Sequence, residues 1–374
     1  MIQQPPFWLF VIAFVCLLGP IVFVHEFGHY IVGKLFGVGA ETFSIGFGRE
    51  IVGWTDRSGT RWKVGWLPLG GFVRFVGDDS AASTPAPEED VPEELRARSF
   101  HLKPLWQRYL IVLAGPAANF LLAIAIFAGV FALVGTPQTN LVGKVQPHSA
   151  AARAGIQAGD RIISVAGRST PAFNDVFNVV AVRPAEQVRI AFERRSVVRS
   201  VEVRLGTDTV KDGNRSFQRG LLGVSPSAEI RDPVPLVRAV PMAVVHTASW
   251  TRAIVDGLTQ LVRGRISPKQ IGGPLKIAQF AGQGASLGLL SFIMLAALIS
   301  INLGFINLLP VPMLDGGHLF FYTVEAVRRR PVSLQAQDWA FRGGLALILA
   351  LMLFTTLNDL DSFGLWDRLG RLIG

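Results

Sequence analysis

Residues 25–29 read His25-Glu26-Phe27-Gly28-His29 and lie inside a hydrophobic segment that covers about residues 7–32. A segment of this length can cross a lipid bilayer, where ionisable side chains are costly unless they bind a metal, line a cavity or pair with one another. Histidines at positions i and i+4 share one face of a helix, and the spacing His-Glu-x-x-His is typical of zinc-dependent hydrolases. The stretch therefore predicts a membrane-spanning helix that carries a metal site.

The residue types of this motif suit metal-assisted hydrolysis. Two imidazoles one helical turn apart, His25 and His29, can reach the same zinc ion. Glu26 lies on the adjacent strip of the helix, where its carboxylate can take a proton from a water that the metal activates. A chance match is disfavoured because the chain contains only 6 histidines. We predict Glu26 as the catalytic base and His25 and His29 as metal ligands.

A catalytic zinc site normally has a third protein ligand, and Asp315 is the strongest candidate. It lies in the stretch 307–317, which reads NLLPVPMLDGG. The two prolines break the helix that begins near Leu287, and the glycines let the backbone bend close to the metal. An aspartate in such a stretch can also be a simple turn residue. Its occurrence together with the histidine motif favours the role of metal ligand.

The pair of motifs resembles the site-2 protease family (M50) of intramembrane zinc metalloproteases, and in particular its bacterial sigma-E-regulating branch with a single PDZ domain. The first motif is His-Glu-x-x-His and the second is Asn-x-x-Pro-x-Pro-x-Leu-Asp-Gly. Residues 115–120 (GPAANF) and 272–275 (GGPL) agree with the same family. The resemblance covers nearly the whole chain. It implies a zinc cofactor and cleavage of a peptide bond inside the transmembrane segment of a single-pass membrane protein.

The composition independently excludes an ordinary soluble protein. Half of the 374 residues are hydrophobic and only 17% are charged. Runs that can cross a bilayer cover about residues 7–34, 105–134, 287–309 and 343–357, of which the last is short. The lone Cys16 cannot form an internal disulfide. We predict a membrane α-helical fold with about four transmembrane helices, a membrane-associated β-hairpin and an inserted α+β PDZ-like domain.

The positions of lysine and arginine predict the orientation. They are concentrated after the first span and at residues 328–330, between the last two spans, so both regions should be cytoplasmic. The region between the second and third spans then lies in the periplasm, and the metal motif lies toward the cytoplasmic side of a bacterial inner membrane. No removable signal peptide is expected, since the first span has no basic start and no small-residue cleavage site before its motif. The net charge of +9 is scattered and argues against nucleic-acid binding.

Residues 61–75 mix strand-forming residues with a Pro/Gly turn and predict a β-hairpin. The resemblance implies that this hairpin dips into the membrane beside the active site, with Gly70, Gly71 and Phe72 binding substrate. A plain cytoplasmic hairpin is the alternative. A strand edge at this place could pair with an unwound stretch of the substrate. The acidic residues 78–94, rich in Ser, Ala and Pro, predict a disordered linker.

Residues 136–227 have the pattern of a compact α+β domain. Strands are predicted near 160–165, 187–192 and 201–205, around a helix near 174–182. Residues 149–160 resemble a turn of a bacterial PDZ domain, and Gly220-Leu221-Leu222-Gly223-Val224 resembles the carboxylate-binding loop of that family in circularly permuted examples. The resemblance implies either peptide binding by strand addition or a steric filter over the active site, and the sequence favours neither.

The pattern of residues 233–264 is amphipathic, with Trp250, Ile254, Leu258 and Leu261 at helical spacing among arginines. Helices on the outer membrane surface fit this pattern best, and a further crossing is the less favoured alternative. The predicted organisation is a transmembrane catalytic core in two halves, residues 1–135 and 286–374. A PDZ-like periplasmic domain at 136–227 and interfacial helices at 228–285 lie between these halves.

Polar residues of the third span complete the predicted site. The resemblance implies that Asn302 and Asn307 bind the substrate backbone, and Asn307 is also placed to donate to a developing oxyanion. Asn302 can equally form a hydrogen bond between helices. We expect His318 to support the site rather than bind the metal.

The expected partners are the lipid bilayer and single-pass membrane proteins already shortened on the outer side, such as anti-sigma factors or remnant signal peptides. Two other classes of function are possible. A PDZ membrane scaffold with a structural metal is disfavoured, because structural zinc normally has four protein ligands and no fourth is evident. A metal transporter would need more carboxylates within its spans.

Overall fold

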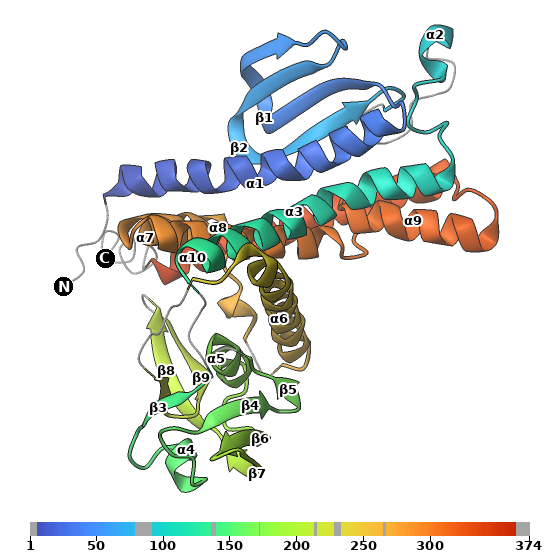
Figure 1. The fold of residues 1–374 in the computed structure, drawn as a ribbon. Helices are drawn as coiled ribbons and strands as arrows, with labels where there is room; N and C mark the ends of the chain where they lie inside the picture. Colours follow the sequence, from blue (N-terminus) through green and yellow to red (C-terminus); the bar gives the residue numbers. More distant parts are fainter. Residues whose placement is uncertain are drawn as a thin grey trace. The chain divides into compact units, whose positions relative to one another are not determined.

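The computed structural model of the chain describes residues 6–78, 92–135, 140–171, 173–212, 215–227, 233–264 and 267–363. The chain folds into two compact units, whose elements are labelled in Figure 1. The first unit comprises Met1–Ile124 and Lys276–Leu353, and the second comprises Ala125–Leu275 and Phe354–Gly374. The boundaries between the units fall within two long helices, α3 and α10.

The first unit is mainly helical. Its elements are α1 (Phe7–Leu35), β1 (Ala40–Thr55), β2 (Arg61–Phe75), α2 (Glu93–Arg96), most of α3 (Leu105–Leu133), most of α7 (Pro274–Ser286), α8 (Leu289–Asn307), α9 (Asp315–Arg328) and most of α10 (Leu334–Ser362). One buried apolar cluster joins α1, α7 and α8 around Leu17 and Ile21. Another joins α1, both strands, α3 and α9 around Phe43 and Ile111. These two clusters hold the helices that carry the predicted site.

Four of the described helices are long and apolar enough to cross a membrane, which confirms the predicted number. The spans are Trp8–Leu35, Leu105–Leu133, Leu289–Asn307 and Gln335–Ser362. The fourth is longer than the predicted run of residues 343–357. Its helix continues through polar residues at both ends, such as Asp338 and Asp359, where hydropathy alone gives no signal.

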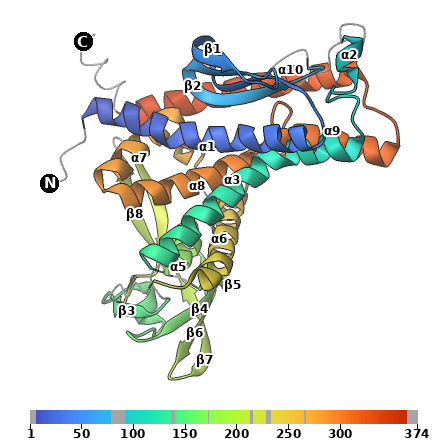
Figure 2. The same cartoon turned by 45° about the horizontal axis from the view of Figure 1, so that its top comes forward.

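The strands β1 and β2 pair antiparallel and lie along α1 (Figures 1 and 2). A hairpin was predicted within residues 61–75, but the two halves of this stretch do not pair with each other. Phe43 of β1 pairs with both Trp62 and Val73, so the first part of β1 lies between the two halves of β2. Gly70, with a φ of 87°, lies between these halves. We did not predict β1 from the sequence, although Phe43, Ile45 and Phe47 alternate with Ser44 and Gly46 in the period of a strand.

The prolines end the third span as predicted. Helix α8 ends at Asn307 and α9 begins at Asp315, after a loop that contains Pro310 and Pro312. This loop is tightly packed, since a Cβ on Gly317 would lie 2.5 Å from the carbonyl oxygen of Val311. The close packing explains the need for glycine two residues after the aspartate, near the start of α9.

Most of the predicted linker at 78–94 lies outside the described residues. Residue 78 and residues 92–94 are described, and in both places the prediction of a disordered surface linker is wrong. Glu93 and Glu94 begin the helix α2. The Asp78 side chain is buried, with its Oδ1 2.8 Å from His101 Nε2, and its Oδ2 accepts a hydrogen bond from the Phe75 N–H at 2.9 Å. The partner His101 is distant in sequence, so local composition could not show that Asp78 belongs to the core.

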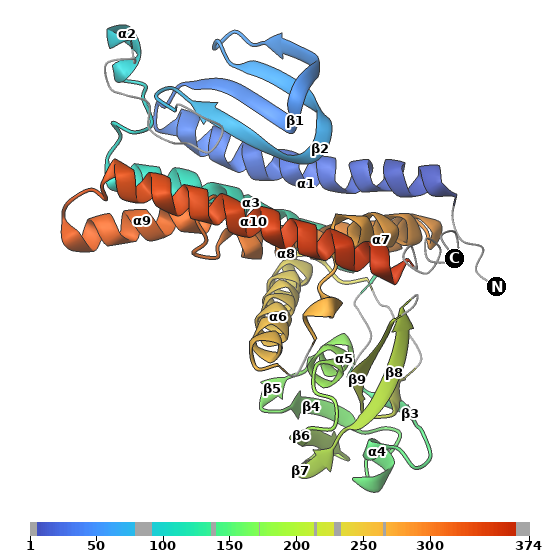
Figure 3. The ribbon, with the colours of Figure 1, turned by 180° about the vertical axis from the view of Figure 1, so that it is seen from behind.

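The second unit contains an α+β module, which we define as the described residues from 140 to 227. Its elements are β3 (Val142–Val145), α4 (Ala150–Arg153), β4 (Arg161–Val165), β5 (Arg168–Ser169), α5 (Phe173–Ala181), β6 (Gln187–Arg194), β7 (Val197–Arg204), β8 (Gly206–Asp212), β9 (Arg215–Leu221) and β10 (Val224–Pro226). The module is followed by α6 (Leu236–Val262) and a short 3-10 helix (Pro268–Gln270). The four-stranded sheet has the order β5-β4-β6-β7, and β3 with β10 and β8 with β9 form two further pairs (Figure 3).

The predicted strands correspond to β4, β6 and β7, and the predicted helix corresponds to α5. Their inward side chains form one apolar core that includes Ile162, Val179, Ile190 and Val203. The alternation of buried and exposed residues along β6 is the period-two pattern of a sheet with one covered face. This regular alternation is why the module was predictable from local sequence.

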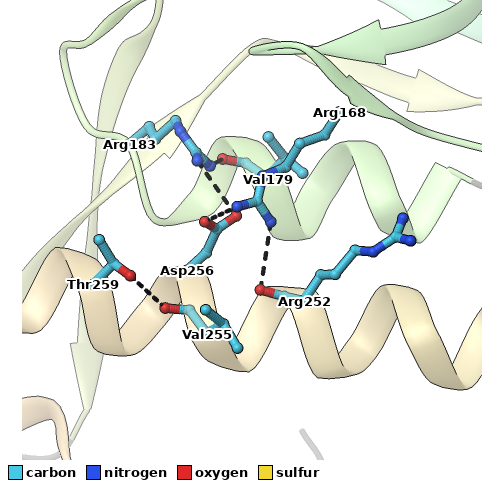
Figure 4. A network of polar contacts seen from close by, with 7 residues as sticks. All are labelled: Arg168, Val179, Arg183, Arg252, Val255, Asp256 and Thr259. Carbon is cyan, nitrogen blue, oxygen red and sulfur yellow. Dashed lines mark hydrogen bonds and ion pairs between the residues drawn. The ribbon is translucent and has the colours of Figure 1, made fainter.

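A buried ionic network joins α6 to the module (Figure 4). Asp256 of α6 pairs with Arg168, and its Oδ2 lies 3.3 Å from Arg183 Nη2. The side chains of Asp256 and Arg183 are each only 8% exposed. Arg183 also donates to the carbonyl oxygen of Val179 in α5 at 2.6 Å. One carboxylate on α6 therefore compensates two arginines of the module.

Replacing Asp256 with alanine should loosen the contact between α6 and the module. The change leaves Arg183 buried without a counter-charge, and loss of one partner of a buried ion pair costs about 3–5 kcal/mol. Hydrogen exchange of the full chain should show a fall of this size in the opening free energy of α5 and α6. Glu202→Gln, which removes an exposed pair with Arg189, is the matched control and should change little. Unchanged protection in the Asp256 variant would show that the network does not hold α6.

Candidate metal centre

The three predicted metal ligands lie together within the first unit. His25 and His29 come from successive turns of α1, and Asp315 is the first residue of α9. The Nε2 atoms of the two histidines are 3.4 Å apart. Asp315 Oδ2 lies 3.2 Å from His25 Nε2, and Asp315 Oδ1 lies 3.5 Å from His29 Nε2. The structure therefore brings the two imidazoles together with a carboxylate that lies almost 300 residues further along the chain.

This set of donor atoms fits a zinc ion. Ligands at about 2.0–2.1 Å in a tetrahedron are about 3.3 Å from one another, and the three separations between the donor atoms are close to this value. Asp315 Oδ2 is buried and has no hydrogen-bond partner among the described residues. A buried carboxylate oxygen without a hydrogen bond is costly unless a cation compensates it. The residues can therefore hold zinc and leave a fourth position for water.

Contacts from α3 orient the two histidines. His29 Nδ1 lies 2.9 Å from the carbonyl oxygen of Ile111, to which it can donate. His25 Nδ1 lies 3.1 Å from the side-chain nitrogen of Asn119. The imidazole of His29 also lies so close to Gly115 that a Cβ there would overlap the ring. We did not predict these three roles from the sequence, although a Gly-Pro pair and an asparagine inside an apolar span were visible signals.

The metal ligands line a cavity of about 400 Å³. Glu26 also lines it, as do the predicted substrate residues Gly70, Gly71, Phe72 and Asn307. The strand passes very close to the predicted base, since a Cβ on Gly71 would lie 2.9 Å from Glu26 Cγ. Strand β2 therefore lies beside Glu26, the carboxylate that would activate water.

The two asparagines of α8 occupy different places. Asn307 lines the cavity, and its Nδ2 lies 3.5 Å from His25 Nε2. Asn302 is not among the described residues that line the cavity. Five residues of an α-helix turn the side chain by about 140°, which accounts for the difference. The geometry therefore places Asn307 at the site and gives no support to a substrate-binding role of Asn302.

His318 lies one turn after Asp315 in α9 and lines the same cavity, but it is outside the three-residue cluster. Burial lowers the pKa of the His318 imidazole, so the side chain is largely neutral near neutral pH. A neutral imidazole can donate one hydrogen bond and accept another without adding charge beside the cluster.

Comparisons with known proteins agree with this site. The sequence profile of peptidase family M50 matches residues 13–351. A Rhizobium meliloti protein with a provisional zinc metalloprotease name is 43% identical over 358 residues, which cover 93% of this chain and 96% of the relative. Metalloprotease MmpA of Caulobacter vibrioides is 37% identical over 395 residues, which cover 98% of this chain and 99% of the relative.

The spans and the site thus define a membrane metalloprotease with a zinc cofactor. The chain belongs to peptidase family M50, whose profile covers both motifs and all four spans except the ends of the first and last.

A solved structure is also similar to part of the chain. It is the PDZ domain of an SdrC-like protein from Listeria monocytogenes, with 15% identity over 24% of this chain and 90% of that domain. The TM-score is 0.20. The PDZ-like nature of the module stays a prediction.

Proposed function

We propose that the protein is an intramembrane zinc endopeptidase that hydrolyses a peptide bond inside the transmembrane segment of single-pass membrane proteins. The observation that carries the proposal is the cluster of His25, His29 and Asp315 beside Glu26, with three of these four residues on a helix apolar enough to span a membrane. Ionisable side chains at that depth are expected to be functional. Donor separations that match tetrahedral zinc support hydrolysis as that function.

In the proposed mechanism His25, His29 and Asp315 hold the metal, which supplies Lewis-acid chemistry when it is bound. The Glu26 carboxylate takes a proton from the attacking water and then delivers it to the amide nitrogen of the leaving segment. Asn307, whose Nδ2 lies beside the cluster, donates to the scissile carbonyl oxygen as negative charge develops there. These roles account for every polar side chain of the predicted site except Asn302, which is not among the described residues that line the cavity, and His318, which would support the site.

Substrate binding requires that a transmembrane helix unwinds, because helical peptide bonds already use their own hydrogen-bonding groups. The stretch Gly70, Gly71 and Phe72 lines the cavity, and we propose that it pairs with the unwound segment as an added strand. The absence of side chains on the two glycines supports this role, since it lets an extended backbone pass close to Glu26. Gly71 is therefore proposed as a contact that brings the scissile bond to the base.

We further propose that α6 lies on the outer surface of a bacterial inner membrane. Its exposed side chains include the aliphatic Val237, Val244, Val255 and Leu258, which recur on one face, and its buried residues include the polar Asp256. Such a helix presents its apolar face outward, as interfacial helices do toward lipid. The α+β module would then lie in the periplasm and act as a steric filter that excludes substrates with large outer domains.

This proposal is tested with two single-pass substrates reconstituted with the full-length protein in liposomes. One substrate has its folded outer domain, and the other is the same chain with that domain removed. Only the trimmed substrate should be cleaved, since the filter excludes the other. The control pair uses trimmed substrates with a flexible or a short outer tail, and both should be cleaved. If neither the untrimmed nor the trimmed substrate is cleaved, the protease assignment is contradicted. If these two substrates are cleaved equally, the role of the module as a filter is contradicted.

A further inference from the structure

His25 can bind a metal through Nε2 only when its own proton lies on Nδ1. A neutral imidazole has one N–H group and one lone pair, on different ring nitrogens. His25 Nε2 is the atom that faces the other two donors, at 3.4 Å from His29 Nε2 and 3.2 Å from Asp315 Oδ2. Nδ1 points the other way and lies 3.1 Å from the Asn119 side-chain amide. That amide therefore decides which ring nitrogen carries the proton.

The Asn119 amide has two orientations with opposite effects. With Nδ2 toward the ring, the amide donates to Nδ1, and the imidazole proton must then lie on Nε2, where it blocks metal binding. In this orientation Asn119 Oδ1 is buried and has no hydrogen-bond partner among the described residues. A half turn of the amide exchanges the two atoms without changing the shape of the side chain. Oδ1 then accepts the proton of His25 Nδ1, so the oxygen gains a hydrogen-bond partner and the Nε2 lone pair is free to bind a metal, while Nδ2 takes the buried position that Oδ1 held.

The backbone of Asn119 is firmly held, so the amide can turn without moving away from the ring. The residue is completely buried in α3. Its carbonyl oxygen accepts a hydrogen bond from Ser300 Oγ of α8 at 2.8 Å. Helix α8 also approaches closely at Gly304, where a Cβ would lie 3.3 Å from Asn119 Cβ. A buried polar group fixed in this way is suited to orient a metal ligand.

We propose that Asn119 is a positioning residue for the metal centre, in which Oδ1 accepts the Nδ1 proton of His25 and so directs the Nε2 lone pair toward zinc. The proposal rests on the proposed role of His25 as a zinc ligand. Asn119 itself touches neither substrate nor metal. Partners of metal-bound histidines typically change metal affinity about 10-fold to 100-fold when they are removed.

The test compares Asn119→Leu with Asn119→Asp in the purified full chain. Leucine has a similar size and neither accepts nor donates, whereas aspartate can only accept when it is ionised. The zinc dissociation constant is measured by competition with a chromogenic chelator, and the ligand field is followed by the absorption of bound Co²⁺. We expect Asn119→Leu to bind zinc about 10-fold to 100-fold more weakly. Asn119→Asp should retain wild-type affinity and the wild-type cobalt spectrum.

A matched control separates this role from general destabilisation. Asn140 is another buried asparagine, and its Nδ2 donates to two backbone carbonyl oxygens of the α+β module rather than to a histidine. Asn140→Leu should lower the thermal stability of the protein without changing its affinity for zinc. The unfolding temperature of each variant is measured with chelator and with zinc, and its rise on adding zinc gives a second estimate of affinity.

The outcomes distinguish this inference from the proposed function. If the wild-type chain binds no zinc, the proposed function fails. If the wild type binds zinc and Asn119→Leu binds it equally well, only the role of Asn119 is overturned. Weakened binding in Asn119→Asp, equal to that in Asn119→Leu, would show that the amide must donate, which also overturns the proposal.

Discussion

Replacing Glu26 with glutamine is expected to abolish peptide-bond hydrolysis while the zinc content of the protein stays unchanged. Glutamine keeps the size of the side chain but cannot take a proton from water. A general base contributes about 10²-fold to 10⁴-fold to the rate, so the residual cleavage should fall by at least that factor. The rate of cleavage of a trimmed single-pass substrate and the zinc content are measured on the same preparation.

Glu325→Gln provides the matched control for this substitution. Glu325 is a glutamate of α9 that pairs with Arg108 at 3.0 Å. It is not one of the described residues that line the cavity of the metal centre. This variant should cleave at a rate close to that of the wild type. Wild-type cleavage by the Glu26 variant would remove Glu26 as the base, and loss of its zinc would mean that Glu26 holds the metal.

Replacing Asp315 with alanine should have the second large effect, the loss of zinc. The change removes one of three donors and leaves two histidines on a single helix to hold the ion. Loss of a residue that only contacts a metal ligand lowers metal affinity by up to roughly 100-fold. Asp315 is a direct ligand, so its loss should lower the affinity for zinc by more than this factor. Zinc per chain after dialysis, measured by atomic emission, should fall from about one to near zero.

Asp338→Ala is the control for this result. Asp338 lies in α10, where it forms an exposed pair with Arg342 at 3.0 Å. An exposed pair one turn apart contributes little, so both zinc content and folding should be unaffected. Full zinc occupancy in the Asp315 variant would show that the third ligand has been misassigned.

The parts of the structure that could be predicted from the sequence are those that local patterns determine. His25 and His29 share a helix face by spacing alone, and the two prolines that end α8 are visible as letters. Asp315 was found because few carboxylates occur near membrane depth. The alternation of strand residues likewise showed the sheet of the α+β module before its contacts were known.

The missed features depend on partners that are remote in the chain. The burial of Asp78 requires His101, and the position of β1 between the halves of β2 requires both halves. The contact of Asn119 with His25 joins two helices across 94 residues. No local pattern contains these pairings, because tertiary packing decides them. A glycine such as Gly115 shows the same limit, since only the neighbouring His29 ring explains why a side chain is excluded there.

The central claim is that the chain cuts a peptide bond within a transmembrane segment by using zinc. The most direct measurement is mass spectrometry of both products of a trimmed single-pass substrate, cleaved in liposomes containing ¹⁸O-labelled water. We predict one cleaved bond inside the apolar segment, with ¹⁸O in the new carboxylate. We also predict that activity is lost with a chelator and restored by zinc. Cleavage only outside the apolar segment, or cleavage that persists after zinc has been removed, would contradict the account.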